Sequence, residues 1–99
     1  MKYVVAWEIR PNVSEDEWAR SLQIFEKWSP AEGNNYLEFL WRVDDNGGFA
    51  VVETDDVTLA ARDVAAFSIF FDFKVYPVLE IRESARIAAE AIEYRRSVG

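Results

Sequence analysis

The hydrophobic and polar positions along the chain divide it into seven segments of two kinds. Segments dense in β-branched and aromatic residues predict strands at 2–9, 36–43, 48–54 and 71–79. Apolar residues at helical spacing predict helices at about 14–28, 57–67 and 81–96. Ser14, followed three residues later by Glu17, matches a capping box, so the first helix is expected to begin there. The order along the chain is therefore β-α-β-β-α-β with a further C-terminal helix.

This order predicts an α+β fold of the ferredoxin-like kind. In that arrangement the βαββαβ elements form an antiparallel sheet with strand order 4-1-3-2, and the helices lie on one face. The chain of 99 residues suits a single domain spanning 1–99. Strands one and three would then be central, and strands two and four would be the edges.

Odd and even positions of the predicted strands differ in character, and side chains alternate across a strand. Even positions combine small apolar residues with charged ones, which predicts the face that the helices cover. Odd positions are apolar on all four strands, with one carboxylate at Glu53, which predicts the uncovered face. The apolar residues at these odd positions are Tyr3, Val5, Trp7, Ile9, Leu37, Phe39, Trp41, Val43, Phe49, Val51, Phe71, Phe73, Val75, Pro77 and Leu79.

The hairpin between strands two and three decides whether their odd positions share a face. A two-residue turn at Asn46-Gly47 would pair odd with even positions. A three-residue loop, 45–47, with Gly47 in the left-handed conformation, pairs Trp41 with Val51 and Val43 with Phe49. We expect the three-residue loop, because it keeps the apolar residues together.

An apolar face of this size needs a cover. Each large aromatic side chain buries about 150–250 Å², so several exposed rings would cost a large part of the stability of a domain. A homodimer through this face is the prediction, since closed two-fold dimers are the commonest assembly. The alternative is that the third helix covers the face within one chain.

Composition and charge exclude several classes of partner and chemistry. Eighteen acidic residues against eleven basic ones give a net charge of −7, which disfavours nucleic acid and anionic membranes as partners. The chain has no cysteine and no histidine, so thiol chemistry, zinc sites of the common kinds and histidine-ligated haem are excluded. We expect no metal and no cofactor. No stretch predicts a membrane span or a secretory signal, which makes a cytoplasmic location the expectation.

Three stretches carry a resemblance to known proteins: residues 1–8, 47–56 and 73–78. In these the chain resembles the dimeric α+β-barrel superfamily, in which two ferredoxin-like sheets pack face to face, and within it an uncharacterised bacterial family of short proteins. The better-understood members include cofactor-independent monooxygenases, haem-degrading enzymes, muconolactone-isomerase-like proteins and aldoxime dehydratases. The resemblance implies the fold and the dimer and implies no reaction. The absence of histidine argues against the haem-using members.

Candidate site residues lie on the odd face. Glu53 is its one carboxylate, predicted opposite Phe39 with no basic neighbour, and an apolar setting would raise its pKa and suit it to acid–base catalysis with Tyr3. The alternative is that Glu53 reaches solvent at the mouth of the barrel. The candidate ligand-binding residues are the aromatic ones Trp7, Phe39, Trp41, Phe49 and Phe73. These rings would equally serve as dry dimer core.

Two functions remain open at this point. The first is a homodimeric α+β barrel that binds a small apolar or aromatic molecule, with cofactor-independent turnover as an extension. The second is a non-enzymatic assembly protein whose aromatic face is only a dimer interface. A void between the two sheets of the dimer, or a ligand that co-purifies with the protein, would favour the first function, and a filled interface would contradict it.

Overall fold

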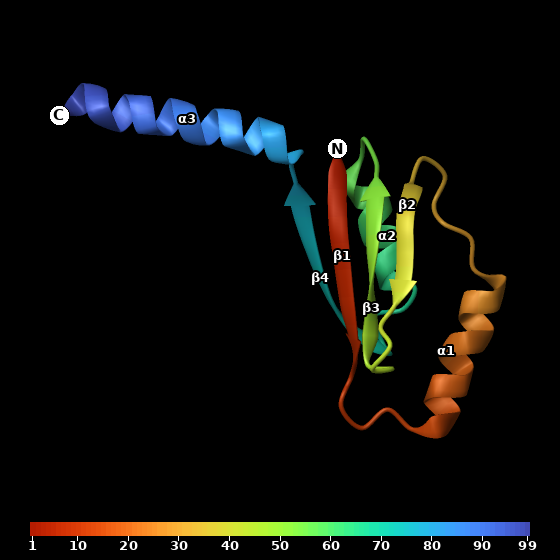
Figure 1. The fold of residues 1–99 in the computed structure, drawn as a ribbon. Coiled ribbons are helices and arrows are strands. Elements are labelled where there is room, and N and C mark those ends of the chain that lie inside the picture. Colours follow the sequence, from red (N-terminus) through yellow and green to blue (C-terminus); the bar gives the residue numbers. More distant parts are fainter.

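All seven predicted elements form, in the predicted order. A computed structural model describes residues 1–99, with ends that differ from the expected ones by at most two residues (Figure 1). The elements are β1 (Lys2–Ile9), α1 (Glu15–Lys27), β2 (Asn35–Trp41), β3 (Gly47–Glu53), α2 (Val57–Ala65), β4 (Phe71–Val78) and α3 (Ile81–Val98).

Short polar side chains start the first two helices. The Ser14 hydroxyl accepts a hydrogen bond from the Glu17 amide at 3.1 Å, and the Ser14 amide donates to the Glu17 carboxylate at 3.3 Å. This confirms the capping box. At α2 the Asp56 carboxylate accepts from the Thr58 amide at 2.9 Å. Both caps satisfy amides that the first helical turn leaves without a backbone partner.

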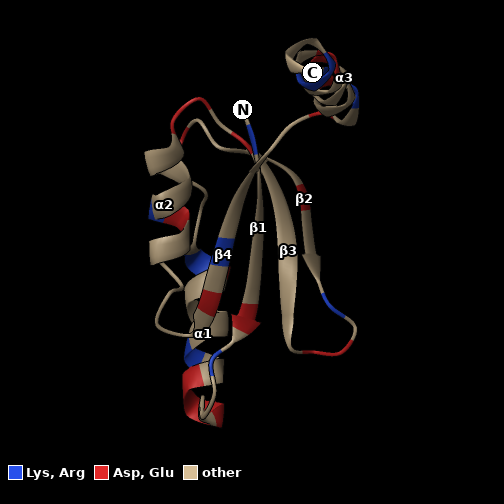
Figure 2. Ribbon diagram, turned by 90° about the vertical axis from the view of Figure 1, so that its left-hand side faces the viewer, with Lys and Arg blue, Asp and Glu red and all other residues tan.

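The four strands form one antiparallel sheet in the order β2-β3-β1-β4. This is the predicted ferredoxin-like order, followed by the extra C-terminal helix. Figure 2 shows α1 and α2 on one side of the sheet and no helix across the other side. We call these the helix side and the open side.

The hairpin between β2 and β3 has four loop residues, so the prediction of a three-residue loop is wrong. The Arg42 amide donates to the Gly47 carbonyl at 2.7 Å, and Trp41 lies opposite Gly48. The left-handed residue is Asp45, with φ 63°, and not Gly47. The Asp44 carboxylate accepts from the Asn46 amide at 3.2 Å and pairs with Arg42, so side-chain hydrogen bonds close this longer loop.

A bulge at Leu37 shifts the register of β2 once more. Tyr36 lies opposite Val52, whereas Glu38 lies opposite Val51. The extra residue moves the later part of β2 by one position relative to β3. As a result Tyr36, Phe39 and Trp41 all lie on the helix side, although their positions are not all odd.

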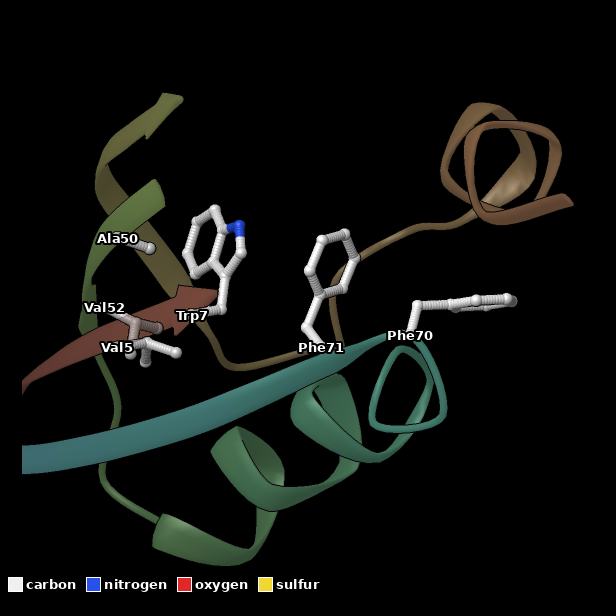
Figure 3. Packing of buried hydrophobic residues seen from close by; sticks show 6 residues of the cluster. All are labelled: Val5, Trp7, Ala50, Val52, Phe70 and Phe71. Carbon is white, nitrogen blue, oxygen red and sulfur yellow. The ribbon is translucent and has the colours of Figure 1, made fainter. Parts of the chain in front are cut away.

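The prediction that the odd positions form an uncovered face is therefore wrong. The odd residues of β1 and β4 do share a face, since Val5 lies opposite Val75 and Trp7 opposite Phe73. That face is the helix side, and the even residues of β3 join it. The buried core cluster on and beside it consists of Val5, Trp7, Ala50, Val52, Phe70 and Phe71 (Figure 3).

The open side of the sheet is mixed in character. Its apolar centre includes Leu40, which is 55% exposed, and Phe49, which is 46% exposed, paired across β2 and β3. Charged residues flank this centre, as with Glu8, which lies opposite Asp72. The aromatic residues of the strands are thus divided between the two sides of the sheet, and most of them face the helices.

The last helix, α3, extends beyond the end of the sheet (Figures 1 and 2). None of its residues is buried. The molecule is consequently 61 Å long with a radius of gyration of 17.8 Å, against about 13 Å for a compact domain of about 100 residues. Neither α3 nor any other helix has both the length and the apolar character that a bilayer span requires.

Gly48 offers a test of the register. A Cβ at this position would lie 2.3 Å from the Leu40 carbonyl oxygen and 2.5 Å from Cζ2 of Trp7. Gly48→Ala should therefore lower the free energy of unfolding by about 1–3 kcal/mol, the usual cost of overpacking, in urea denaturation followed by circular dichroism. Gly99→Ala is the control: no atom lies within 4 Å of a Cβ at this position, and the left-handed φ of 93° is at the last residue, where it can change without moving the rest of the chain. Equal stability of the two variants would contradict the pairing of Trp7 with Gly48.

Candidate functional site

A cavity of about 420 Å³ lies between α1, α2 and the helix side of the sheet. Fifteen of its seventeen lining residues are hydrophobic. Both its volume and its apolar lining are typical of small-molecule sites in proteins. It is the candidate functional site.

Aromatic residues of the sheet form one wall of the cavity. The ring centroid of Trp7 lies 5.6 Å from that of Phe39 and 6.2 Å from that of Phe73. Trp41 and Phe71 continue this wall, with centroids 6.1 Å apart. Figure 3 shows the rings of Trp7 and Phe71 projecting from the same side of their strands. The rings of this wall come from β1, β2 and β4. Their positions relative to one another therefore depend on the register of the sheet.

The opposite wall comes from α1, whose apolar residues recur at helical spacing. Its rings contact those of β2: the Trp18 centroid lies 5.5 Å from that of Trp41, and the Phe25 centroid lies 5.9 Å from that of Phe39. Contacts between such large side chains hold the helix backbone a side-chain length away from the strand. Space for a ligand remains beside these rings.

One end of the cavity is polar. Asp63 of α2 lines it and is only 6% exposed. Its carboxylate accepts hydrogen bonds from the Ala31 amide at 2.9 Å, the Asn34 side-chain amide at 2.8 Å and the Tyr36 hydroxyl at 2.7 Å. None of the ion pairs in the structure involves Asp63. Three neutral donors therefore support this buried charge.

Tyr36 completes the polar end. Burial raises the pKa of the Tyr36 phenol well above its ordinary value of 10.0, and the hydrogen bond to Asp63 and the negative charge of Asp63 raise it further. The phenol is therefore protonated at neutral pH and donates its proton to Asp63. Its oxygen keeps lone pairs that can accept a hydrogen bond from a bound molecule.

Four of the five predicted ligand-binding residues meet at this cavity: Trp7, Phe39, Trp41 and Phe73 all line it. The fifth, Phe49, lies on the open side of the sheet, opposite Leu40. The register of β3 accounts for this separation: odd residues of β1 lie opposite even residues of β3, as with Trp7 and Gly48, and the four-residue loop likewise places Trp41 opposite Gly48. Binding by the four lining residues stays a prediction.

The two predicted catalytic residues lie on opposite faces of the sheet, and neither lines the cavity. Tyr3 is on the helix side, packed against the core cluster and outside the cavity lining. Glu53 is at the end of β3 on the open side, opposite Lys2 on β1 and Asn35 on β2. The expectation that Glu53 lies opposite Phe39 with no basic neighbour is wrong, because the register differs. A joint catalytic role of Glu53 and Tyr3 stays an untested prediction.

Sequence reasoning missed Asp63 and the aromatic residues of α1 as parts of a site. A signal for Asp63 was present: it shares the apolar stripe of α2 with Ala60, Val64 and Phe67, which lie three residues before it and one and four after it. A carboxylate on the buried stripe of a helix needs hydrogen-bond donors nearby. Those donors come from residues 31–36, and the sequence alone does not place that segment beside α2.

The Tyr36 phenol predicts a pH dependence of stability. Folding raises its pKa, so its contribution to stability is complete below the unfolded value of about 10 and is lost as the pH rises through the folded value. Between about pH 9 and about pH 11, urea denaturation should show the wild type losing more stability than Tyr36→Phe. Tyr94→Phe, at an exposed position of α3, should follow the wild type. Parallel curves for the wild type and Tyr36→Phe would contradict the prediction.

Comparison with known proteins identifies the family of the chain and gives no activity for it. No curated protein matches the chain. A family model matches residues 1–92, which include the whole sheet, α1, α2 and most of α3. The chain therefore belongs to the family described as Domain of unknown function (DUF3303).

Proposed function

We propose that the protein binds a small, largely apolar or aromatic molecule in the cavity between α1, α2 and the sheet. The observation that carries this proposal is the cavity itself, with fifteen hydrophobic residues among its seventeen lining residues. An unfilled apolar cavity destabilises a protein core by about 24 cal/mol for each Å³. A ligand that fills this one would recover part of that loss and would bind for the same reason.

Binding is better supported than turnover. The polar side chains that line the cavity include Ser21, Asp63 and Tyr36. The Ser21 hydroxyl donates to the Trp18 carbonyl at 2.7 Å, and the Tyr36 hydroxyl donates to Asp63 at 2.7 Å. Asp63 also accepts two further hydrogen bonds, from Ala31 and Asn34. Groups so engaged anchor the polar end of a ligand without being free to transfer protons at neutral pH. Cofactor-independent turnover would have to use these groups in place of Glu53 and Tyr3.

The neutral fluorescent probe N-phenyl-1-naphthylamine tests this proposal. All four tryptophans of the chain line the cavity, so bound probe should quench their emission by energy transfer and should itself become brighter. At a free concentration of about 100 times its dissociation constant, the probe should raise the free energy of unfolding by about 2.7 kcal/mol.

Val64→Phe, which adds a ring to the cavity wall, is the blocking variant and should weaken probe binding by about tenfold or more. Val43→Phe is the matched control, because Val43 is fully exposed in the hairpin loop and its substitution should leave binding unchanged. Probe binding that is equal in the wild type and in folded Val64→Phe would contradict a site in this cavity.

A second copy of the chain is the proposed cover for the open side of the sheet and for α3. One side of α3 carries Ile81, Ala85, Ala88 and Ile92, at the spacing of an apolar stripe. Ile81 is 81% exposed. An isolated helix of this length is marginally stable in water, so its apolar stripe needs a surface to pack against.

The dimensions of α3 and the sheet agree. The eighteen residues of α3 extend about 27 Å, and strands of seven or eight residues extend about 23–26 Å. Only two residues link β4 to α3, and the Lys2 ammonium pairs with Glu80 in that link at 2.5 Å. This holds the start of α3 at the end of its own sheet. The apolar centre around Leu40 and Phe49 would then pack against the partner, with α3 reaching beside it.

Light scattering tests the dimer. The wild type should have the mass of two chains at micromolar concentration, and Phe49→Glu should have the mass of one, because it places a charge in the apolar centre of the open side. Val43→Glu, with the same added charge in the exposed hairpin loop, should remain dimeric. A wild type that is monomeric under these conditions would overturn this proposal and leave the binding proposal intact.

A further inference from the structure

We infer that the ligand of this cavity is an organic cation, an apolar or aromatic body that carries an ammonium group. The inference rests on the proposed binding function and adds the charge of the ligand. It follows from what lies at the polar end of the cavity: a buried carboxylate that no cation of the protein neutralises, enclosed by aromatic rings.

Asp63 is the only charged residue that lines the cavity. Its three hydrogen bonds come from a backbone amide, a side-chain amide and a phenol, all of them neutral. These bonds stabilise the negative charge without cancelling it. A carboxylate has about four acceptor positions, so three bonds leave room for one more donor. An ammonium group supplies both the missing donor and the missing charge.

Aromatic rings line the same cavity as Asp63, among them those of Trp28, Tyr36 and Phe67. Tyr36 donates to Asp63, and the ring centroid of Trp28 lies 6.1 Å from that of Tyr36. The centroid of Phe67, one turn of chain beyond Asp63, lies 5.5 Å from that of Trp28. The faces of aromatic rings carry partial negative charge and attract ammonium groups. The aromatic rings and the carboxylate of Asp63 therefore both favour a ligand with a positive charge.

An anionic ligand would be repelled by the charge of Asp63. Its carboxylate would lie in an apolar cavity beside Asp63, and two such charges disfavour each other strongly where water is scarce. The net charge of −7 of the whole chain adds to this discrimination at long range. A neutral ligand would bind through its apolar body alone.

Asp63 also has a structural role, because its hydrogen bonds tie residues 31–36 to α2. The two roles can be separated by their dependence on charge. In the variant Asp63→Asn the side chain keeps one oxygen that can accept from the loop and loses the negative charge. A purely structural Asp63 would leave no preference among ligands that differ only in charge.

Three probes with the same naphthyl body test the inference by calorimetry at neutral pH: 2-naphthylmethylammonium, 2-naphthylmethanol and 2-naphthoate. The wild type should bind the ammonium probe about tenfold more tightly than the alcohol, and the carboxylate more weakly than either. Asp63→Asn should weaken binding of the ammonium probe about tenfold and leave the alcohol unchanged. Asp72→Asn is the matched control: it removes the same charge from an exposed residue, so it should keep the preference.

The outcomes separate this inference from the binding proposal. Equal affinities of the wild type for the ammonium and alcohol probes, or tighter binding of the carboxylate, would overturn the inference and leave binding in the cavity standing. If no naphthyl probe and no N-phenyl-1-naphthylamine binds, the proposed function itself fails. If Asp63→Asn does not fold by circular dichroism, the order of the three affinities in the wild type decides the inference without it.

Discussion

The packing of the Trp7 indole over Gly48 is the contact on which the rest of the structure depends. A Cβ on Gly48 would lie 2.5 Å from the indole, so the absence of a side chain there gives the ring its place. Gly48 lies opposite Trp7 on β1 and opposite Trp41 on β2. Gly48 therefore lies between two tryptophans on the same side of the sheet, at a position where a side chain would collide with one of them.

The cavity follows from this alignment. Once Trp7, Phe39 and Phe73 share a face, α1 contacts the sheet through rings, and rings of this size do not fill the layer completely. Asp63 and Tyr36 close one end by hydrogen bonds that also hold the loop before β2 against α2. The same groups thus stabilise the fold and give the cavity its one polar end. A ligand that binds there contacts the elements that hold the domain together.

Much of the fold could be predicted from local patterns. The capping box at Ser14, the strand-like and helical spacings, and the turn after β2 were sufficient for the order of elements and for the strand order of the sheet. The shared face of β1 and β4 was also predicted, because alternation within each strand is regular. Trp7 and Phe73 came together for that reason, and the family match agrees with an uncharacterised family.

The side of the sheet that faces the helices could not be predicted. It depends on how β3 pairs with both of its neighbours: even residues of β3 lie opposite odd residues of β1, and the four-residue hairpin loop and the bulge at Leu37 set which residues of β2 join them. The predicted loop would have placed Trp41 opposite Val51, whereas Trp41 lies opposite Gly48. A shift by an odd number of residues transfers side chains to the other face. The pairing of β3 with β1 and with β2 places Glu53 and Phe49 on the open side, away from the other predicted site residues.

The sequence by itself determined the elements, their order, the acidic charge and the absence of thiol and imidazole chemistry, since these depend on residue type and local spacing. Only the tertiary structure decided that the aromatic surplus lines a cavity under the helices, that Asp63 is its one charge, and that α3 extends free of its own sheet. Those features depend on contacts between residues far apart in the chain. The free energy of such contacts depends on how the side chains pack, and local sequence patterns give no information about packing.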